Sequence, residues 1–380
     1  MIDIIVAGAG PAGSEAALVL ARAGVRVLIV DRESFPRDKL CGDTLNPGGV
    51  ALLDDLQIDG GPLAQAPRLS GMLVTSPRTE VLARYAAPLA GRAIVRRTLD
   101  AWLLDEAIRA GARFESGVTV VRALADETSG RAIVRGVVLR RAGHAEDLRV
   151  PAPLTIAAEG RRSPTAMSMR LIRHPPQPRR WAYGVYAEGV LGLGDYGEMH
   201  VRPGHYIGVA PIDDRITNIC VVVDRHPRHR GEAPIDLVRS IVMRDSRLRD
   251  RLAGATFDDR VRVLGPLAVD ATAVGVAGLL LAGDAAGFID PMTGDGLHLA
   301  MRGAVLAATE AITALEHGDL DAAVTRLEAA RRRVLGPKLR FNRVLRGLVG
   351  SPASVTLAGY CAAVMPGVLR RVIAIAGDAA

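Results

Sequence analysis

Cys41 stands in the segment FPRDKLCGDTLNPGG, residues 35–49, which is rich in proline and glycine. It is one of three cysteines in the 380-residue chain, and structural cysteines usually lie in apolar runs. A thiol in such a loop could donate a proton, because its ordinary pKa of about 8.5 is readily tuned by its surroundings. Arg37 and Lys39 would favour the thiolate, whereas burial would favour the thiol. Two roles therefore stay open for Cys41, a catalytic acid or a small packing residue.

A dinucleotide-binding unit precedes this loop. The segment IDIIVAGAGPAGSEAALVLARAGVRVLIVDRE predicts a strand at residues 2–7, a helix at 14–23 and a strand at 25–30. Gly8 permits a tight turn, Gly10 lets the backbone approach a pyrophosphate, and Gly13 allows the helix to pack closely on the strand. Asp31 ends the second strand, where it can accept from a ribose hydroxyl and disfavours the 2′-phosphate of NADP. The cofactor-binding residues expected here are Gly8, Gly10, Pro11, Ala12, Gly13, Asp31 and Arg32.

A second segment, GLLLAGDAAGFIDPMTGDGLHLAMRGAVLAATEAI, indicates a flavin rather than NAD. It predicts a buried strand at residues 279–282, an acid, a glycine loop and a long helix, without the GxGxxG and distant acid of another nucleotide site. Asp284 can accept from ribityl hydroxyls, and the amides of residues 296–298 can stabilise negative charge at the N1–C2=O edge of a reduced flavin. The residues expected at the flavin are Gly283, Asp284, Pro291, Gly294, Gly296 and Leu297.

Together the GxGxxG turn, the CGD loop and GDAAGFIDPMTGDG resemble the geranylgeranyl reductase family over residues 1–310. Members are FAD enzymes with the p-hydroxybenzoate hydroxylase type of fold, related to flavin monooxygenases and flavin halogenases. The resemblance implies tightly but non-covalently bound FAD, with the loop of Cys41, Gly42 and Asp43 beside the flavin ring and the thiol facing substrate. It also implies that Arg96, which opens an R-x-x-L-D helix, contacts FAD and that Val120 lies along the adenine.

The chain departs from the family pattern in two places. The family's P-x-x-Y-x-W-x-F-P motif reads PGHYIGVAP here, so two large aromatic residues are replaced, and the implied substrate wall is Tyr206, Gly208, Ala210 and Pro211. Either the substrate is bulkier than a slim prenyl chain, or Trp181, Tyr183 and Tyr186 refill the space. The A-D-G-x-x-S-x-x-R segment of related hydroxylases reads AAEGRRSPTA, with Glu159 and Ala166 at the changed positions, which leaves the interdomain contacts there open.

The expected fold class is α/β: a Rossmann-type FAD-binding domain, an inserted, mostly antiparallel substrate sheet, and C-terminal helices. The predicted boundaries are residues 1–70, 92–165 and 266–310 for the FAD domain, 71–91 and 166–265 for the substrate domain, and 311–380 for the helical region. The ligand is expected at the junction of the domains, where clefts usually form.

Composition limits the partners and the compartment. The net charge is +7, yet aromatic residues are only 3% and no basic stripe is interleaved with them, so nucleic acid is not expected. The basic amphipathic tail leaves a peripheral membrane contact open, and the oligomeric state is open too. No CxxC is present and His226 and His229 lie in a charged loop, so we expect no metal site. The odd number of cysteines, their wide spacing and the lack of a secretory signal favour a cytoplasmic protein.

Three functions compete. The first is a reductase that adds hydride from flavin to a carbon–carbon double bond of a hydrophobic prenyl or polyketide-like substrate. The second is an NAD(P)H-dependent monooxygenase that hydroxylates an aromatic or lipid-like substrate, and the third is a non-catalytic flavoprotein. Flavin halogenases that resemble this fold need a lysine in the substrate region. A halogenase is therefore disfavoured, because Lys39 and Lys338 are the only lysines and neither lies in that region. The CGD loop and DPMTGDG resemble the reductases more closely. No second nucleotide fold is visible, so NAD(P)H would dock transiently or a ferredoxin would donate electrons.

Overall fold

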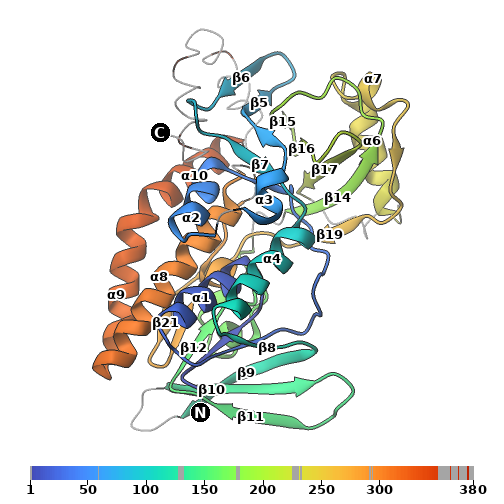
Figure 1. The fold of residues 1–380 in the computed structure, drawn as a ribbon. Coiled ribbons are helices and arrows are strands. Elements are labelled where there is room, and N and C mark those ends of the chain that lie inside the picture. The colour runs from blue at the N-terminus through green and yellow to red at the C-terminus, as the bar shows by residue number, and fades with distance from the viewer. Residues whose placement is uncertain are drawn as a thin grey trace.

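The computed structural model describes residues 2–58, 60–126, 132–176, 180–224, 231, 233–290, 292, 294–349, 360, 367 and 375. Figure 1 shows a parallel sheet with its helices in the lower half of the molecule and a larger sheet at the upper right. These two sheets come from segments that alternate along the chain. The predicted α/β fold, with an inserted, mostly antiparallel sheet and C-terminal helices, is confirmed.

The parallel sheet has the strand order β21-β22-β12-β1-β2-β8, in which only the edge strand β21 runs antiparallel to its neighbour. Its inner strands are short and completely buried, as expected for a sheet that is covered on both faces. The strands are β1 (Ile4–Ala7), β2 (Val27–Val30), β8 (Arg113–Glu115), β12 (Leu154–Ala157), β21 (Gly275–Val276) and β22 (Leu279–Leu281).

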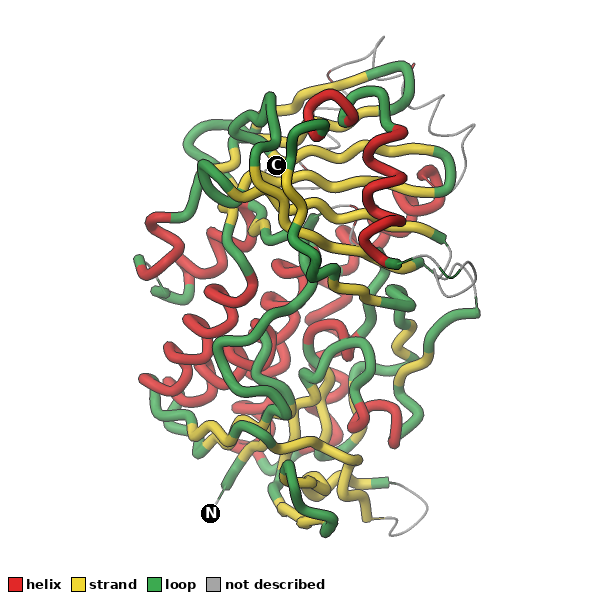
Figure 2. The backbone as a smooth tube through the Cα atoms, turned by 90° about the vertical axis from the view of Figure 1, so that its right-hand side faces the viewer, coloured by secondary structure: helices red, strands yellow, loops and turns green. Residues whose placement is uncertain are grey.

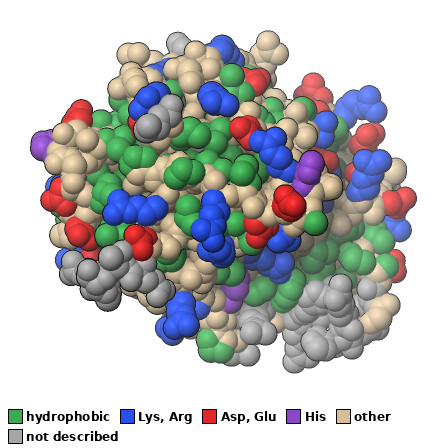
Figure 3. All heavy atoms as spheres, turned by 90° about the horizontal axis from the view of Figure 1, so that it is seen from below, with side chains coloured by type: hydrophobic (Ala, Val, Ile, Leu, Met, Phe, Trp, Pro, Cys, Tyr) green, Lys and Arg blue, Asp and Glu red, His purple; other side chains and the backbone are tan. Residues whose placement is uncertain are grey.

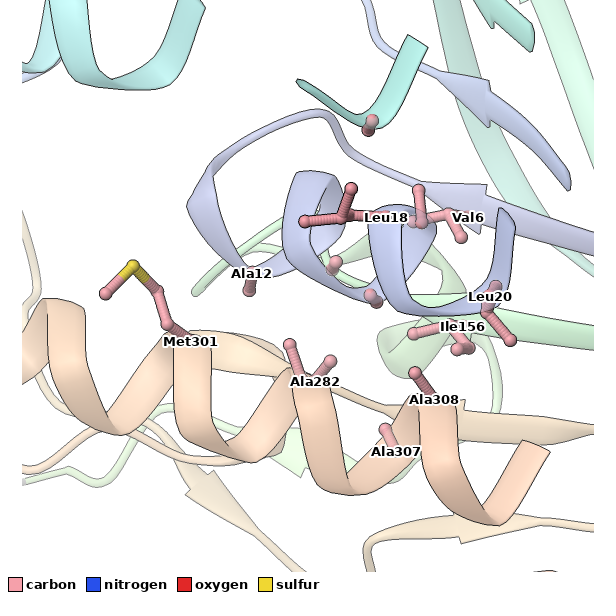
Figure 4. Close-up of a cluster of buried hydrophobic side chains, with 14 of the residues drawn as sticks. Val6, Ala12, Leu18, Leu20, Ile156, Ala282, Met301, Ala307 and Ala308 are labelled. Carbon is pink, nitrogen blue, oxygen red and sulfur yellow. The ribbon is translucent and has the colours of Figure 1, made fainter. Parts of the chain in front are cut away.

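Helices cover one face of this sheet. Figure 4 shows Ala12 on the side of one helix that faces the other, which carries Ala307 and Ala308, and such small side chains allow the two helices to approach closely. The first helix begins at Pro11 rather than at Ser14, because proline suits the first turn, where its missing N–H costs nothing. The helices are α1 (Pro11–Arg22), α4 (Arg96–Arg109) and α8 (Gly296–His317), with α9 (Leu320–Val334) packed on the outside of α8.

A three-stranded antiparallel sheet covers the other face, at the bottom of Figure 1. Its valines and leucines interdigitate with the apolar side chains that the parallel strands direct away from the helices, such as Ile5 and Leu28. The strands are β9 (Val118–Asp126), β10 (Ile133–Arg141) and β11 (Asp147–Pro151).

The larger sheet, here called the substrate sheet, has the strand order β18-β14-β17-β16-β15-β5-β6, with β19 paired to β14. Figure 2 shows helix α6 lying across its outer face. Alternate residues of each strand pack under that helix, whereas the others face the parallel sheet's half of the molecule. Its elements are β5 (Gly71–Thr75), β6 (Glu80–Arg84), β14 (Trp181–Glu188), β15 (Gly197–Arg202), β16 (His205–Pro211), β17 (Ile216–Val223), β18 (Thr256–Phe257), β19 (Arg262–Leu264), α6 (Pro234–Arg244) and α7 (Arg249–Leu252).

Short elements connect the two halves. They are β3 (Thr44–Leu45), α2 (Pro47–Asp55), α3 (Gly61–Gln65), β4 (Arg68–Leu69), β7 (Gly91–Ala93), α5 (Pro164–Ser168), β13 (Ile172–Arg173), β20 (Asp270–Ala271), the 3-10 helix Gly283–Ala286 and α10 (Gly336–Val349). The Asn46 side chain caps α2, which begins at Pro47, by accepting from the Gly49 amide.

On the face seen from below, basic and acidic side chains are interspersed with apolar ones rather than gathered by sign (Figure 3). None of the helices in the described part of the chain is long and apolar enough to cross a membrane.

Candidate active site

A cavity of about 620 Å³ lies where the carboxyl ends of β1, β2 and β22 meet the inner face of the substrate sheet. Segments that are far apart in the chain meet at this cavity. The predicted cofactor residues that line it are Gly8, Gly10, Pro11, Ala12, Asp31, Arg32, Cys41, Gly42, Arg96, Val120, Gly283, Asp284, Gly294, Gly296 and Leu297. The predicted substrate residues that line it are Tyr206, Gly208 and Ala210.

Four predicted residues are not among the side chains or backbone that line the cavity. Gly13 packs under the turn, where a Cβ would lie 1.8 Å from the carbonyl oxygen of Gly8, so it serves helix–strand packing as expected. Asp43 is buried behind the cavity wall, with 1% of its surface exposed. Pro211, at the end of β16, also lies off the cavity. Pro291 lies outside the described residues.

The glycine turn and the acid of the next strand are joined directly. Gly8 has φ +96°, and a Cβ there would lie 2.6 Å from the carbonyl oxygen of Ala158, so only glycine fits. The amide of Ala9 donates to Asp31 Oδ2 at 2.7 Å, and the amide of Glu33 donates to Oδ1 at 2.9 Å. These bonds hold the Asp31 carboxylate at the cavity wall, the position that an acceptor for ribose hydroxyls requires.

Two arginines share one buried acid beside the glycine turn. Arg96 forms a bidentate pair with Asp100, with distances of 2.6 and 2.9 Å, and Arg37 Nη1 lies 3.1 Å from the same carboxylate. The Asp100 side chain is 0% exposed. A Cβ on Gly10 would lie 3.4 Å from the Arg37 guanidinium, so this cation reaches the point where the backbone is open to a pyrophosphate.

Two further cations line the same cavity. Arg161 Nε lies 3.9 Å from Asp284 Oδ2. Burial and the neighbouring guanidinium groups lower the pKa of Lys39 to about 8. Burial raises the pKa of Asp284, against the lowering effect of Arg161 and Lys39. Arg37, Lys39, Arg96 and Arg161 thus place four basic groups on this wall of the cavity.

These residues fit FAD. These basic groups suit the two negative charges of a dinucleotide pyrophosphate. At the other end, α8 begins at Gly296, and Gly296 and Leu297 line the cavity, so the positive end of a 22-residue helix faces it. Asp284 lies between these two regions, in the 3-10 helix that follows β22. Adenosine, pyrophosphate, ribityl chain and ring therefore each have a suitable wall.

The Cys41 thiol lines the cavity near the Arg96 guanidinium. Burial raises the pKa of Cys41, although Arg96 lowers it, so the thiol keeps its proton at neutral pH. A second thiol, Cys220, lines the same cavity, and burial raises its pKa to about 12. Cys361 lies outside the described residues.

The space left by the missing motif aromatics is open on the cavity side. A Cβ on Gly208 would meet no described atom closer than the Cys220 carbonyl oxygen at 3.8 Å. Tyr183 does not refill this space, because it is 0% exposed and packs under α6 on the opposite face of β14. Tyr186 is on the inner face but donates its hydroxyl to Asp43, and Trp181 lines the cavity beside Gly265.

Comparison with known sequences agrees with this geometry. The profile of the family described as "FAD binding domain" matches residues 1–335. The chain belongs to this family. A menaquinone reductase of Mycobacterium tuberculosis is 33% identical over 325 residues, which cover 80% of this chain and 75% of the relative. A digeranylgeranylglycerophospholipid reductase of Methanopyrus kandleri is 30% identical over 332 residues, which cover 84% and 83%. The chain is therefore an FAD-dependent oxidoreductase, and the predicted kinship with geranylgeranyl reductases is confirmed.

Solved structures show the same fold. A geranylgeranyl bacteriochlorophyll reductase-like protein from Thermoplasma acidophilum superposes with a TM-score of 0.79 at 21% identity, over 93% of this chain and 89% of that one. The flavin-dependent halogenase CmlS superposes with a TM-score of 0.75 at 26% identity, over 87% of this chain and 62% of that one.

In this flavoprotein the altered segment around Glu159 has its own contacts. Glu159 accepts from the Ser163 hydroxyl at 2.6 Å and from the Thr165 hydroxyl, and so braces the start of α5. The contacts to residues 265 and 266 come instead from the two arginines that follow: Arg161 donates to the Pro266 carbonyl at 3.1 Å and Arg162 to the Gly265 carbonyl at 2.7 Å. Ala166, the other changed position of this segment, is completely buried.

The sequence motifs alone do not assign Arg37, Lys39 or Arg161 to the cofactor. The signal was present as basic residues in PRDK and GRRS, two loops that each adjoin a predicted cofactor motif. Charge alone did not distinguish them from solvated arginines, which this chain has in abundance.

Proposed function

We propose that this flavoprotein is a reductase that saturates a carbon–carbon double bond in a neutral, ring-bearing isoprenoid lipid. The observation that supports this most directly is that a protonated thiol, Cys41, lies on the wall of the cavity that also holds the flavin-binding residues. Two of its curated relatives are named as reductases of isoprenoid lipids, menaquinone and digeranylgeranylglycerophospholipid.

Saturating a double bond requires a hydride and a proton, added to neighbouring carbons. Reduced FAD supplies the hydride. Cys41 supplies the proton as the thiol S–H bond breaks and a new C–H bond forms, which leaves a thiolate. The positive charge of the nearby Arg96 guanidinium stabilises the thiolate until solvent returns the proton. Electrons would reach the flavin from NAD(P)H docking transiently or from a ferredoxin.

The lining of the cavity under the substrate sheet supports a neutral, apolar substrate. Its described side chains are uncharged except Glu198, whose carboxylate is buried and held by Arg251 and His200. Such a wall offers no partner for a charged headgroup. The open space beside Gly208 gives room for a ring. The uncharged residues at this end are Leu45, Asn46, Leu69, Met72, Tyr85, Met199, Gly208, Val209 and Ala210.

The test uses the FAD-loaded protein, reduced chemically without oxygen and mixed with menaquinone or with a geranylgeranyl lipid. Menaquinone can also be reduced at its ring, so the product is reoxidised in air before mass spectrometry. Only a saturated side chain then keeps two added hydrogens. In D₂O both should be deuterium, because the N–H of chemically reduced flavin exchanges with solvent as the thiol does, and Cys41→Ser should lower the rate of saturation. Substrate-stimulated oxygen consumption with an oxygen atom in the product would instead establish a monooxygenase.

A further inference from the structure

The loop that carries Cys41 is held from across the cavity by the substrate sheet. Tyr186, on β14, donates its hydroxyl to Asp43 Oδ2 at 2.7 Å. Asn218, on the neighbouring β17, donates its amide to the same oxygen at 2.6 Å and to the carbonyl oxygen of Cys41 at 3.0 Å. Two strands of the substrate sheet therefore bind the backbone and the acid that flank the thiol.

The same acid is also bound by the FAD-binding half of the protein. The amide of Arg96 donates to Asp43 Oδ1 at 3.0 Å, and the amide of Ile94 donates to the Asp43 carbonyl at 2.8 Å. Asp43 has φ +50°, a left-handed conformation that is uncommon for residues other than glycine. It is 1% exposed, and its side chain, although it does not line the cavity, receives a donor from each side.

We infer that Asp43 is the positioning residue for Cys41, and that Tyr186 and Asn218 of the substrate sheet supply the hydrogen bonds that keep it in place. A buried carboxylate is stable only where donors surround it, so the removal of one donor loosens the whole loop. The inference rests on the proposed function only for the statement that the held thiol is the proton donor. The hydrogen bonds themselves concern the position of the loop.

The test measures the alkylation of Cys41 by iodoacetamide in the FAD-loaded protein, quantified by mass spectrometry of the Cys41 peptide. Tyr186→Phe and Asn218→Ala should each raise the rate roughly tenfold, a factor that corresponds to about 1.4 kcal/mol of easier loop opening. The matched control is Tyr183→Phe. Tyr183 is on the same strand but faces the opposite side, and its hydroxyl has no hydrogen-bond partner in the described part of the chain. Its rate should equal that of the parent protein.

Rates within twofold of the parent for both Tyr186→Phe and Asn218→Ala would overturn the inference. A flavin absorption spectrum and a thermal melt check that each variant is folded and loaded. Should Asn218→Ala fail to fold, Tyr186→Phe decides alone, because it removes a single hydroxyl. The rates for Cys220 and Cys361 in the same digests show whether any increase is confined to the Cys41 loop, as the inference requires.

Single-turnover kinetics keeps this inference separate from the proposed function. If the thiol is the proton donor, loosening its loop should lower the rate of substrate saturation and leave the apparent affinity for substrate nearly unchanged. If Cys41→Ser reduces substrate as fast as the parent protein, the proposed role of the thiol fails. The alkylation result would then still decide whether Asp43 positions the loop.

Discussion

Tryptophan at position 208 should narrow the substrate end of the cavity without disturbing the fold or the cofactor. Gly208 lies in the middle of β16 without a positive φ, so a side chain there meets no backbone penalty. Its Cβ would be 3.8 Å from the nearest described atom, which is ordinary van der Waals contact. The indole of Gly208→Trp must therefore extend into the cavity, which Gly208 lines.

The size of the effect follows from contact area. An indole buries about 150–250 Å². If it removes about 100 Å² of apolar contact from a ring-bearing substrate, then at about 25 cal/mol per Å² the loss is about 2.5 kcal/mol. That loss corresponds to roughly a 70-fold decrease in kcat/KM. A slender prenyl chain should lose much less, because it does not need the filled space.

The assay compares kcat/KM for menaquinone and for an unbranched polyprenyl lipid, beside a thermal melt and the flavin spectrum. The matched control is Gly184→Ala. Gly184 on β14 and Gly208 on β16 lie on either side of Cys220 on β17, and each pairs with it. A Cβ on Gly184, however, would lie 1.9 Å from Leu40 Cδ1. This control should lower stability by about 1–3 kcal/mol through overpacking. A folded, flavin-loaded Gly208→Trp protein with unaltered substrate preference would refute the volumetric reasoning.

Three further predictions concern the cofactor and the thiol. Asp284→Ala should weaken FAD binding by roughly 10- to 150-fold, because a charged hydrogen bond is worth about 1.5–3 kcal/mol, and full flavin occupancy in dilute solution would contradict this. FAD affinity should fall as pH rises through about 8, because Lys39 is cationic only below that pKa and the pyrophosphate favours the cation. Fluorescence titration should show this slope flattened in Lys39→Gln and shifted to higher pH in Lys39→Arg. Cys41→Ser should keep FAD and a native flavin spectrum but lose single-turnover saturation, whereas an unchanged rate would leave Cys41 a packing residue.

The cofactor half of the cavity was largely predictable because each of its parts is a short contiguous motif. The turn at Gly8 and the acid at Asp31 are fixed by one strand–helix–strand unit, and the structure joins them through a single amide. Asp284 and Gly296 follow one strand and open one helix in the same way. In these motifs the number of residues between two positions already determines how far apart they lie in the structure.

The contacts between the two halves could not be predicted in that way. Asp43 is separated from Tyr186 by 143 residues and from Asn218 by 175, and each residue is unremarkable in its own segment. Their meeting depends on the register of β14 and β17, which pairs Tyr186 with Asn218. One error was avoidable: because side chains alternate along a strand, Tyr183 and Tyr186 must face opposite sides, so the two could not both have filled the space beside Gly208.

The substrate sheet is fastened to the FAD-binding half by two links of the same kind. Tyr186 donates to Asp43, and Tyr206 donates to Asp290 at 2.7 Å, so a phenol of the sheet meets a buried acid of a loop at each flank of the cavity. Gly208 lies between them, two residues beyond Tyr206 on the same strand, and takes part in neither link. A larger or smaller side chain at position 208 therefore alters the volume of the cavity, while the distance between the substrate sheet and the loops of Asp43 and Asp290 stays fixed. This arrangement would let the width of the accepted substrate change through one position, without any change in how the Cys41 loop is held.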